Sequence, residues 1–483
     1  VQEQHGVAFD PARLTYDDPK VYDLLCSADT VGVFQVESRA QMNTLPRHKP
    51  RRFYDLVIEV ALIRPGPIQG DMVHPYLRRR NGEEEITYPH PKLKPILKRT
   101  LGIPLFQEQG MQVAVAAAGF TASEADELRL AMGHKRSRER MESLSLRLIS
   151  GMMKNGIDRE AAEKIFMQLA AFADFGFAES HAASFALLVY VSAFFKVYYP
   201  REFYCALLNA QPLGFYSPST IVYEGQRRGV TFLSVDVAKS GWDCAIKGES
   251  VRLGFRYIKS LGNAAREKIE SELAKGAFLS LPDFVHRTGL NRDELEQLAM
   301  VDAFQSFGLD RRQALWQILA LSSRGESELA IVDDNKGQDL LAPMDATEQL
   351  VADFGGMALS TGPHPMSLVR ATLSIKGVLS SQELQRLADK QQVTVAGIVI
   401  IRQRPMTAKG FFFLTLEDEC GFFNIVVKPH YVTQCRKAVV YSNCLLVKGT
   451  LERQDGVLNI MGEEFTPLRF GKIEDSISVR EFR

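Results

Sequence analysis

The chain has 483 residues, which is enough for several domains that each bury a core. Its 46% hydrophobic and 24% charged residues are typical of a globular protein, and the longest apolar run, residues 183–199, is interrupted by Ser192 and Lys196, so we expect no membrane span. Six scattered cysteines without a CxxC pair argue against structural zinc and predict a reducing compartment, the cytoplasm.

The balance of 58 Lys and Arg against 58 Asp and Glu gives no sign of a nucleic-acid partner, but their distribution does. Residues 39–99 hold 13 basic and 6 acidic side chains, and residues 129–147 hold 6 and 2. Residues 326–353 instead hold eight acids and one base, Lys336. Local basic faces on a neutral protein suit one that follows a phosphate backbone. Ordinary solvated helix faces would give the same pattern.

The first 140 residues predict helices and turns. Residues 31–37 alternate apolar and polar side chains, which predicts a short strand. Residues 53–63 are predicted to form an apolar helix, which Arg64-Pro-Gly-Pro67 ends in a rigid corner. This corner either only ends the helix, or it directs Arg64 at a phosphate. A helix over residues 72–80 ends in three arginines, of which Arg78 and Arg79 are candidate DNA contacts. Thr121-Ala-Ser-Glu124 is a capping box that opens the next helix.

Residues 141–209 are predicted to be helical, interrupted at residues 172–184 by a corner rich in small and aromatic residues. This corner is either a packed turn with Ser180 as helix N-cap, or a surface where a ring meets a flat base with Ser180 and His181 as polar partners.

Residues 258–269 have the pattern of a helix–hairpin–helix. Gly262 makes its turn, Lys259 and Asn263 flank that turn, and the following helix offers backbone N–H groups to a phosphate. A second, irregular unit follows at residues 291–316. Residues 322–353 are acidic and loosely periodic, which predicts a linker. Its Gln338-Asp-Leu-Leu341 is a poor match to a sliding-clamp docking motif.

Five strands with a helix between the third and fourth are the order of an OB-fold. They are predicted at residues 395–401, 410–416, 422–427, 444–450 and 457–461, with the helix at residues 431–439 and a hairpin turn at Asp455-Gly456. Phe411, Phe412 and Phe413 alternate between the core and the surface, and Phe412 is the candidate for stacking on single-stranded bases.

Five separated blocks resemble the bacterial C-family (DnaE-type) DNA polymerases, in the order of that family. They are Val31-Gly-Val-Phe-Gln-Val-Glu-Ser38, Arg64-Pro-Gly-Pro67, Phe106-Gln-Glu-Gln109, Leu128-Arg-Leu-Ala-Met-Gly133, and Gly176-Phe-Ala-Glu-Ser-His-Ala-Ala-Ser184. Residues 210–218 and 240–244 are similar to the error-prone branch, also called ImuC. The resemblance covers nearly the whole chain and only the downstream part of the family pattern. Because the chain begins with Val1, we expect a piece of a longer protein.

The resemblance implies a deoxynucleotide site in the fingers. Arg129 falls on the first of two family arginines near the triphosphate. The second position is Leu130, and Lys135 or Arg136 could compensate for the missing arginine. Phe175 falls where the family places an aromatic residue beside the nascent base pair, with Ser180 and His181 as neighbours. None of them is expected to make or break bonds.

The resemblance places the catalytic Mg²⁺ and its aspartates in a palm upstream of Val1. No Asp-x-Asp lies in a strand-like context here, so we expect the chain alone to be inactive. The implied fold is mainly helical and multidomain: helical fingers, tandem helix–hairpin–helix and a C-terminal β-barrel. We divide it into the palm end (1–38), fingers (39–235), hairpin region (236–321), linker and connector (322–390), OB-fold (391–470) and tail (471–483).

The leading interpretation is therefore a fragment of an error-prone, translesion DNA-directed DNA polymerase, a nucleotidyltransferase of DNA repair and damage tolerance. Its implied partners are primed template DNA, dNTPs and the sliding clamp, reached through an accessory polymerase-like protein. The alternatives are a replicative polymerase III alpha-type subunit and a non-catalytic DNA-binding scaffold, with which the OB-fold and hairpins are also compatible.

Overall fold

The computed structural model describes residues 1–64, 67–68, 72–131, 137–170, 177–323, 341–405, 408, 410–454, 457–469 and 479–482. Within these ranges the chain forms two compact units, Val1–Tyr198 and Tyr199–Arg483. The division after Tyr198 falls inside the range predicted for the fingers. Each unit has its own core, and each is described by itself.

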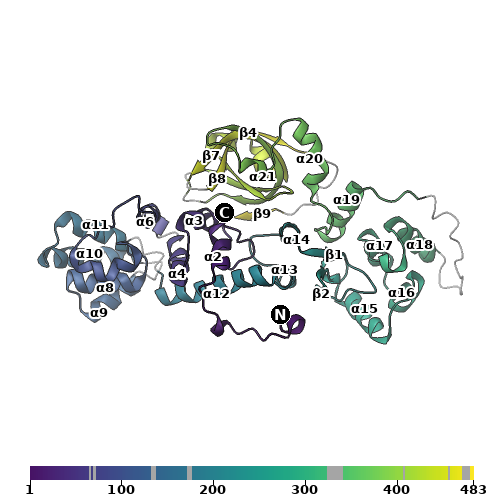
Figure 1. The fold of residues 1–483 in the computed structure, drawn as a ribbon, viewed down its shortest axis with the longest axis horizontal. Coiled ribbons are helices and arrows are strands. Elements are labelled where there is room, and N and C mark those ends of the chain that lie inside the picture. Colours follow the sequence, from purple (N-terminus) through teal and green to yellow (C-terminus); the bar gives the residue numbers. More distant parts are fainter. Residues whose placement is uncertain are drawn as a thin grey trace. The chain divides into compact units, whose positions relative to one another are not determined.

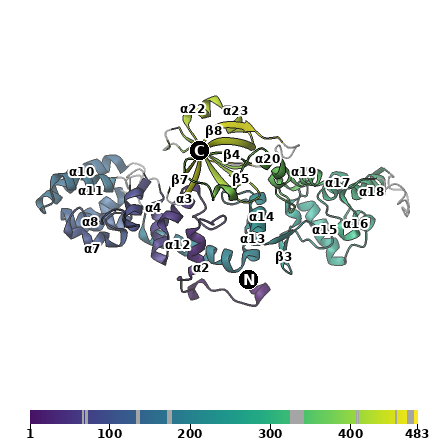
Figure 2. The ribbon, with the colours of Figure 1, turned by 45° about the horizontal axis from the view of Figure 1, so that its top comes forward.

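The first unit is helical. Its elements are α1 (Gln2–His5), η1 (Pro11–Arg13), α2 (Pro19–Cys26), α3 (Arg39–His48), α4 (Phe53–Leu62), α6 (Val73–Arg80), η2 (Pro91–Leu93), α7 (Lys94–Leu97), η3 (Lys98–Thr100), α8 (Gln107–Ala118), α9 (Ala122–Ala131), α10 (Ser137–Lys154), α11 (Arg159–Ala170) and α12 (Glu179–Tyr198). Helices α8 to α11 gather in one bundle (Figures 1 and 2). The predicted capping box is confirmed, because Thr121 N donates to Glu124 Oε2 at 2.8 Å and Glu124 N donates back to Thr121 Oγ1.

Helix α12 is the longest apolar element of this unit, and it packs on α4 and α2. It faces them with small side chains, Ala182, Ala186 and Ala193, which let the helices approach closely. By length and composition it is also the one helix, in the part of the chain that is described, that could cross a membrane. Core helices pass the same test, and α12 buries Lys196 completely.

The strand predicted at residues 31–37 is wrong. These residues form a compact loop in which Gly32 (φ 75°) and Gln35 (φ 64°) take left-handed conformations that no strand allows. The alternation that predicted a strand arises because Val31, Val33 and Val36 are buried.

The second unit begins with two helices and a small sheet, continues as a helical region and ends in a barrel. Its elements are α13 (Pro200–Asn209), α14 (Pro218–Arg227), β1 (Thr231–Leu233), β2 (Ala245–Lys247), β3 (Ser250–Arg252), η4 (Phe255–Tyr257), α15 (Asn263–Lys275), α16 (Leu281–Thr288), α17 (Arg292–Met300), η5 (Gln305–Phe307), α18 (Arg311–Ser323), α19 (Ala346–Met357), α20 (Pro365–Ile375), α21 (Ser381–Leu384), β4 (Gln392–Gln403), β5 (Phe412–Glu417), β6 (Phe422–Val427), α22 (Pro429–Gln434), α23 (Arg436–Tyr441), β7 (Cys444–Gln454), β8 (Val457–Pro467) and β9 (Arg480–Phe482).

The barrel confirms the predicted OB-fold order. Its strands pair as β5-β6-β8-β7-β4, and β4 pairs with β5 to close the ring. Within this ring pairing is antiparallel, with Phe412 opposite Val427, except between β6 and β8, which are parallel with Asn424 beside Asn459. Strand β9 adds to β4 in parallel. Helices α22 and α23 occupy the predicted place between the third and fourth strands. The predicted hairpin turn at Asp455-Gly456 lies outside the described residues.

The predicted linker at residues 322–353 is wrong in part, because α19 occupies its last eight residues, 346–353. Asp345 and Glu348 form a capping box at the start of this helix, and Leu350, Phe354 and Met357 are buried at helical spacing. Of the acidic residues that indicated a linker, Asp345 and Glu348 form this cap, and Asp353 is buried in an ion pair with Arg311 at 2.7 Å. The other five lie outside the described residues. The docking-motif residues Gln338 to Leu340 lie outside the described part of the chain.

Candidate nucleic-acid and nucleotide interface

The corner before α12 is fixed by hydrogen bonds from α8 and α4. The backbone N–H of Gln107 donates to the Phe177 carbonyl at 3.0 Å, and Glu108 Oε2 accepts the N–H of Glu179 at 2.9 Å. The Tyr54 hydroxyl donates to Glu179 Oε1 at 2.7 Å. Glu108 therefore satisfies the helix N-terminus, and the N-cap role considered for Ser180 is wrong, because Ser180 lies inside the first turn.

Arg64 and three rings form a continuous series of cation–ring, edge-on and tilted contacts on this corner. The Arg64 guanidinium lies 3.8 Å from the centre of the Phe177 ring, the Phe177 and His181 rings are 5.0 Å apart, and the His181 and Phe185 rings are 4.3 Å apart. Burial lowers the pKa of Arg64, and its buried Nε has no hydrogen-bond acceptor among the described residues. Ser180 and His181 are exposed. The corner thus presents a cation, an imidazole and aromatic surface together, which are the groups that hold phosphates and bases.

The predicted triphosphate clamp is only partly described. Arg129 lies on the exposed side of α9, with its Nε 2.8 Å from Asp126 Oδ1 in a surface ion pair. Such a pair contributes little, about 0.3–0.5 kcal/mol between helix neighbours, so Arg129 can exchange it for a phosphate. Lys135 and Phe175 lie outside the described residues, and their roles stay predictions.

Arg78 and Arg79 share one carboxylate. Their Nε atoms each lie 2.9 Å from an oxygen of Glu84. Arg79 also donates to the Leu101 carbonyl and the Thr87 hydroxyl, and only 12% of its side chain is exposed. Arg79 thus supports the loop after α6, and little of it remains for DNA. Arg78 keeps 49% of its side chain exposed.

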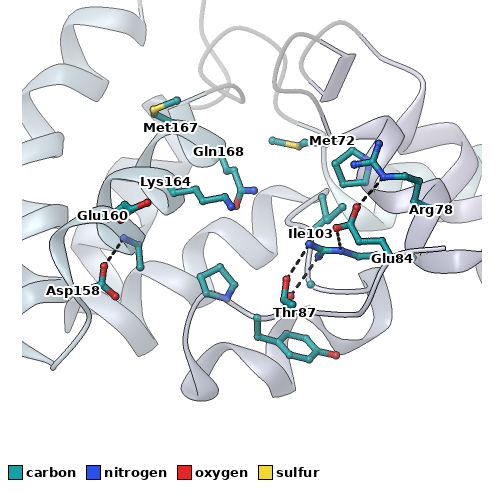
Figure 3. Close-up of a pocket in the computed structure, with 16 residues that line it drawn as sticks. Met72, Arg78, Glu84, Thr87, Ile103, Asp158, Glu160, Lys164, Met167 and Gln168 are labelled. Carbon is teal, nitrogen blue, oxygen red and sulfur yellow. Dashed lines mark hydrogen bonds and ion pairs between the residues drawn. The ribbon is translucent and has the colours of Figure 1, made fainter. Parts of the chain in front are cut away.

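A cavity of about 950 Å³ opens beside Arg78. Figure 3 shows Lys164, Met167 and Gln168 of α11 across it from Arg78 and Glu84. Lys164 is exposed, and no ion pair joins it to any residue in the described ranges. Sequence reasoning missed Lys164, since an exposed lysine on a helix carries no local signal of what faces it.

The first hairpin turns at Lys259 and Ser260, and not at Gly262 as predicted, because Gly262 has an extended backbone. Ser260 takes a left-handed conformation (φ 75°), Gly262 is the N-cap of α15, and a Cβ added at Gly262 would meet nothing within 4 Å. Gly262 and Asn263 are exposed, so the helix N-terminus is open to a phosphate. Lys259 turns the other way: its Nζ donates to the Gly355 carbonyl at 2.8 Å and caps the end of α19.

The stacking role predicted for Phe412 is wrong. Its side chain is 8% exposed and belongs to the barrel core, where it shares a face of β5 with Leu414 and Leu416. Alternation along a strand turns its neighbours Phe411 and Phe413 outward, and both are partly exposed. Those two rings are the ones able to meet a base.

The described residues do not provide a metal centre. Within them, no three His, Cys, Asp or Glu side chains are grouped so as to hold an ion.

Three protein-family models match successive parts of the chain. Residues 1–156 match the bacterial DNA polymerase III alpha subunit finger domain, residues 229–314 a helix-hairpin-helix motif, and residues 393–468 an OB-fold nucleic acid binding domain. Their order is the one predicted from the resemblance, so the predicted fold class is confirmed.

Curated relatives cover almost all of the chain. It is 47% identical over 469 residues to an error-prone DNA polymerase of Anaeromyxobacter sp. (strain K), covering 95% of this chain and 41% of the relative. It is 45% identical over 484 residues to an error-prone DNA polymerase of Mycobacterium tuberculosis, covering 99% and 44%. The chain spans less than half the length of these relatives. Over almost its whole length the chain is thus similar to a part of error-prone DNA polymerases, and that part includes its matches to the finger, helix-hairpin-helix and OB-fold models.

Proposed function

We propose that this chain supplies the nucleotide- and DNA-holding part of an error-prone, DNA-directed DNA polymerase that binds primed template DNA and the incoming dNTP. The observation that carries the proposal is the order of fingers, hairpin and OB modules, with the Arg64–Phe177–His181–Phe185 series on the corner of the first unit. Residues elsewhere in the whole protein would hold Mg²⁺, which activates the primer 3′-hydroxyl and stabilises the departing pyrophosphate.

This chain's own residues bind and orient the dNTP and the DNA. In the proposal, Arg129 pairs with the triphosphate, with Lys135 beside it, and so offsets the charge that develops on the phosphates. Arg64 and the rings it contacts support the nascent base pair, together with Phe175. The open N-terminus of α15 and the exposed Arg78 hold backbone phosphates of the duplex. Phe411 and Phe413 meet single-stranded bases.

Replacing Arg129 tests the proposal in the full-length protein that contains this chain. Losing one charge-assisted hydrogen bond to phosphate should weaken dNTP binding roughly ten- to hundred-fold, with DNA affinity little changed. Arg159→Ala is the matched control, since Arg159 is also an exposed helix arginine, 2.8 Å from Glu163. If Arg129→Ala lowers DNA affinity and leaves the dNTP affinity unchanged, the chain is a DNA-binding scaffold instead.

The error-prone branch is favoured over a replicative subunit because the relatives described above are named error-prone DNA polymerases. Extension across a damaged template by the full-length protein separates the two: a translesion enzyme passes the lesion, and a replicative one stops. We further propose that the protein acts in the cytoplasm and reaches the sliding clamp through an accessory polymerase-like protein.

A further inference from the structure

Phe34 is an exposed aromatic ring on a loop whose backbone is unusually constrained. Its side chain is 38% exposed, although the three valines around it are buried. The residues on either side include Gly32 and Gln35, both with positive φ. A left-handed conformation at a residue other than glycine costs about 1–3 kcal/mol and persists only where the surroundings impose it. Here it turns one phenyl ring outward.

Helix α12 imposes this conformation. The Nζ of Lys196 donates to the carbonyl oxygens of Asp29 and Val31 and to Asp29 Oδ1, at 3.0–3.1 Å. The hydroxyl of Ser192 accepts the backbone N–H of Phe34 itself at 3.1 Å. The main chain of Phe34 is therefore fixed to the helix while its ring faces outward, an arrangement suited to a surface prepared in advance for a ligand.

The ring of Phe34 extends the aromatic series of the corner. It meets Phe185 edge-on, with ring centres 5.2 Å apart and planes at 76°. Phe185 in turn touches His181, one helical turn earlier on α12. An edge contact uses the rim of one ring and leaves a face of the other free. Phe34 thus continues the surface that the proposed function assigns to the nucleotide.

We propose that Phe34 is a positioning residue that stacks on a nucleobase at the fingers corner; this inference rests on the proposed function. A phenyl ring has no hydrogen-bonding atoms, so it supports any base without reading its edge. That chemistry suits an enzyme that accepts mismatched or damaged bases. The base can belong to the incoming nucleotide or to the template strand, and the two sources differ in the test. A base fits better than a protein surface because exposed Ser180, His181 and Ser184 rim the rings with polar groups.

The fluorescent base 2-aminopurine, which stacking quenches, distinguishes these cases. One arm carries it at the templating position of a primed template, and the other supplies it as the free deoxynucleoside triphosphate, each mixed with the full-length protein. Three variants are compared: Phe34→Tyr keeps the aromatic face, Phe34→Leu keeps apolar bulk without it, and Phe34→Ala removes both. Leu188→Ala is the control for an exposed apolar side chain (46% exposed) on α12.

We expect Phe34→Tyr to quench like the unchanged protein, and Phe34→Leu and Phe34→Ala to lose the quenching in one arm, with about ten-fold weaker binding of that ligand. Leu188→Ala should behave like the unchanged protein. Full quenching in Phe34→Leu would overturn the inference and leave the proposed function intact. If Leu188→Ala and Phe34→Ala lost quenching and binding equally, the inference would also be overturned. Any exposed apolar side chain near the corner would then matter equally, as expected of a surface that packs against protein. If the unchanged protein binds neither ligand, the proposed function fails, and this inference fails with it.

Discussion

Lys196→Met removes the anchor of the loop that presents Phe34. Lys196 is fully buried and donates to three oxygens, of which the Val31 carbonyl lies in a residue that is 2% exposed. Asp29 keeps 38% of its side chain exposed and can recover water, but the Val31 carbonyl cannot. An unsatisfied buried acceptor costs about 1–3 kcal/mol, and a lost charge-assisted bond adds a similar amount. Methionine fills the volume of the lysine stem, so the cavity cost is small.

We therefore expect the loop to lose about 3 kcal/mol of stability against local opening. Hydrogen exchange measures this directly, because the N–H groups of Gly32 and Phe34 are held by Glu37 Oε2 and Ser192 Oγ. Their exchange should speed up about hundred-fold in Lys196→Met, and not in the exposed control Lys98→Met. If exchange over residues 29–37 changes less than three-fold, the three hydrogen bonds do not hold the loop.

Three further outcomes follow from side chains in both units. Burial raises the pKa of Glu59 to about 8, above its unfolded value, so folding favours the neutral acid: the contribution of Glu59 to stability is full below pH 4.5 and is lost as pH rises toward 8. Glu59→Gln should remove this pH dependence from the free energy of unfolding of the first unit, measured by hydrogen exchange in urea. If that free energy changes with pH between 5 and 8 as it does in the unchanged protein, the role of Glu59 is contradicted. Phe412→Ala should destabilise the barrel by about 3–5 kcal/mol in thermal unfolding, whereas Phe413→Ala should cost under 1 kcal/mol; equal losses would refute the assigned orientations. Gly262→Ala should fold normally, because nothing lies within 4 Å of an added Cβ, yet weaken duplex binding several-fold in anisotropy titrations; unchanged affinity would exclude a phosphate contact at α15.

Local periodicity was enough to predict the barrel. Strand β6 begins and ends where the alternating pattern does, at Phe422 and Val427, because each strand buries one face and exposes the other. The same signal could have oriented Phe412, which shares its parity with Leu414 and Leu416. The loop at residues 31–37 shows the limit of this reasoning. Its valines are buried by a turning backbone and not by a strand. Lys196, whose ammonium holds this backbone, lies 165 residues from Val31 in the sequence.

The candidate site depends even more on distant partners. A sequence shows that Arg79 is basic, but not that its guanidinium already donates hydrogen bonds to Glu84, Thr87 and the Leu101 carbonyl. It also shows that Lys259 flanks a hairpin, but not that its ammonium caps α19. Arg64 is the opposite case: the turn-forming prolines after it predicted a fixed corner, and the structure places its guanidinium on a ring.

Binding of this chain to primed template DNA, followed by fluorescence anisotropy across a salt series, tests the central claim most directly. If the exposed basic side chains, the hairpin and the barrel each contact DNA, binding should be tight at low salt. Its logarithm should fall steeply with the logarithm of salt concentration, by about 0.9 for each phosphate contacted. Weak binding that salt does not change would contradict the claim, because the basic clusters would then be solvated faces without a nucleic-acid role.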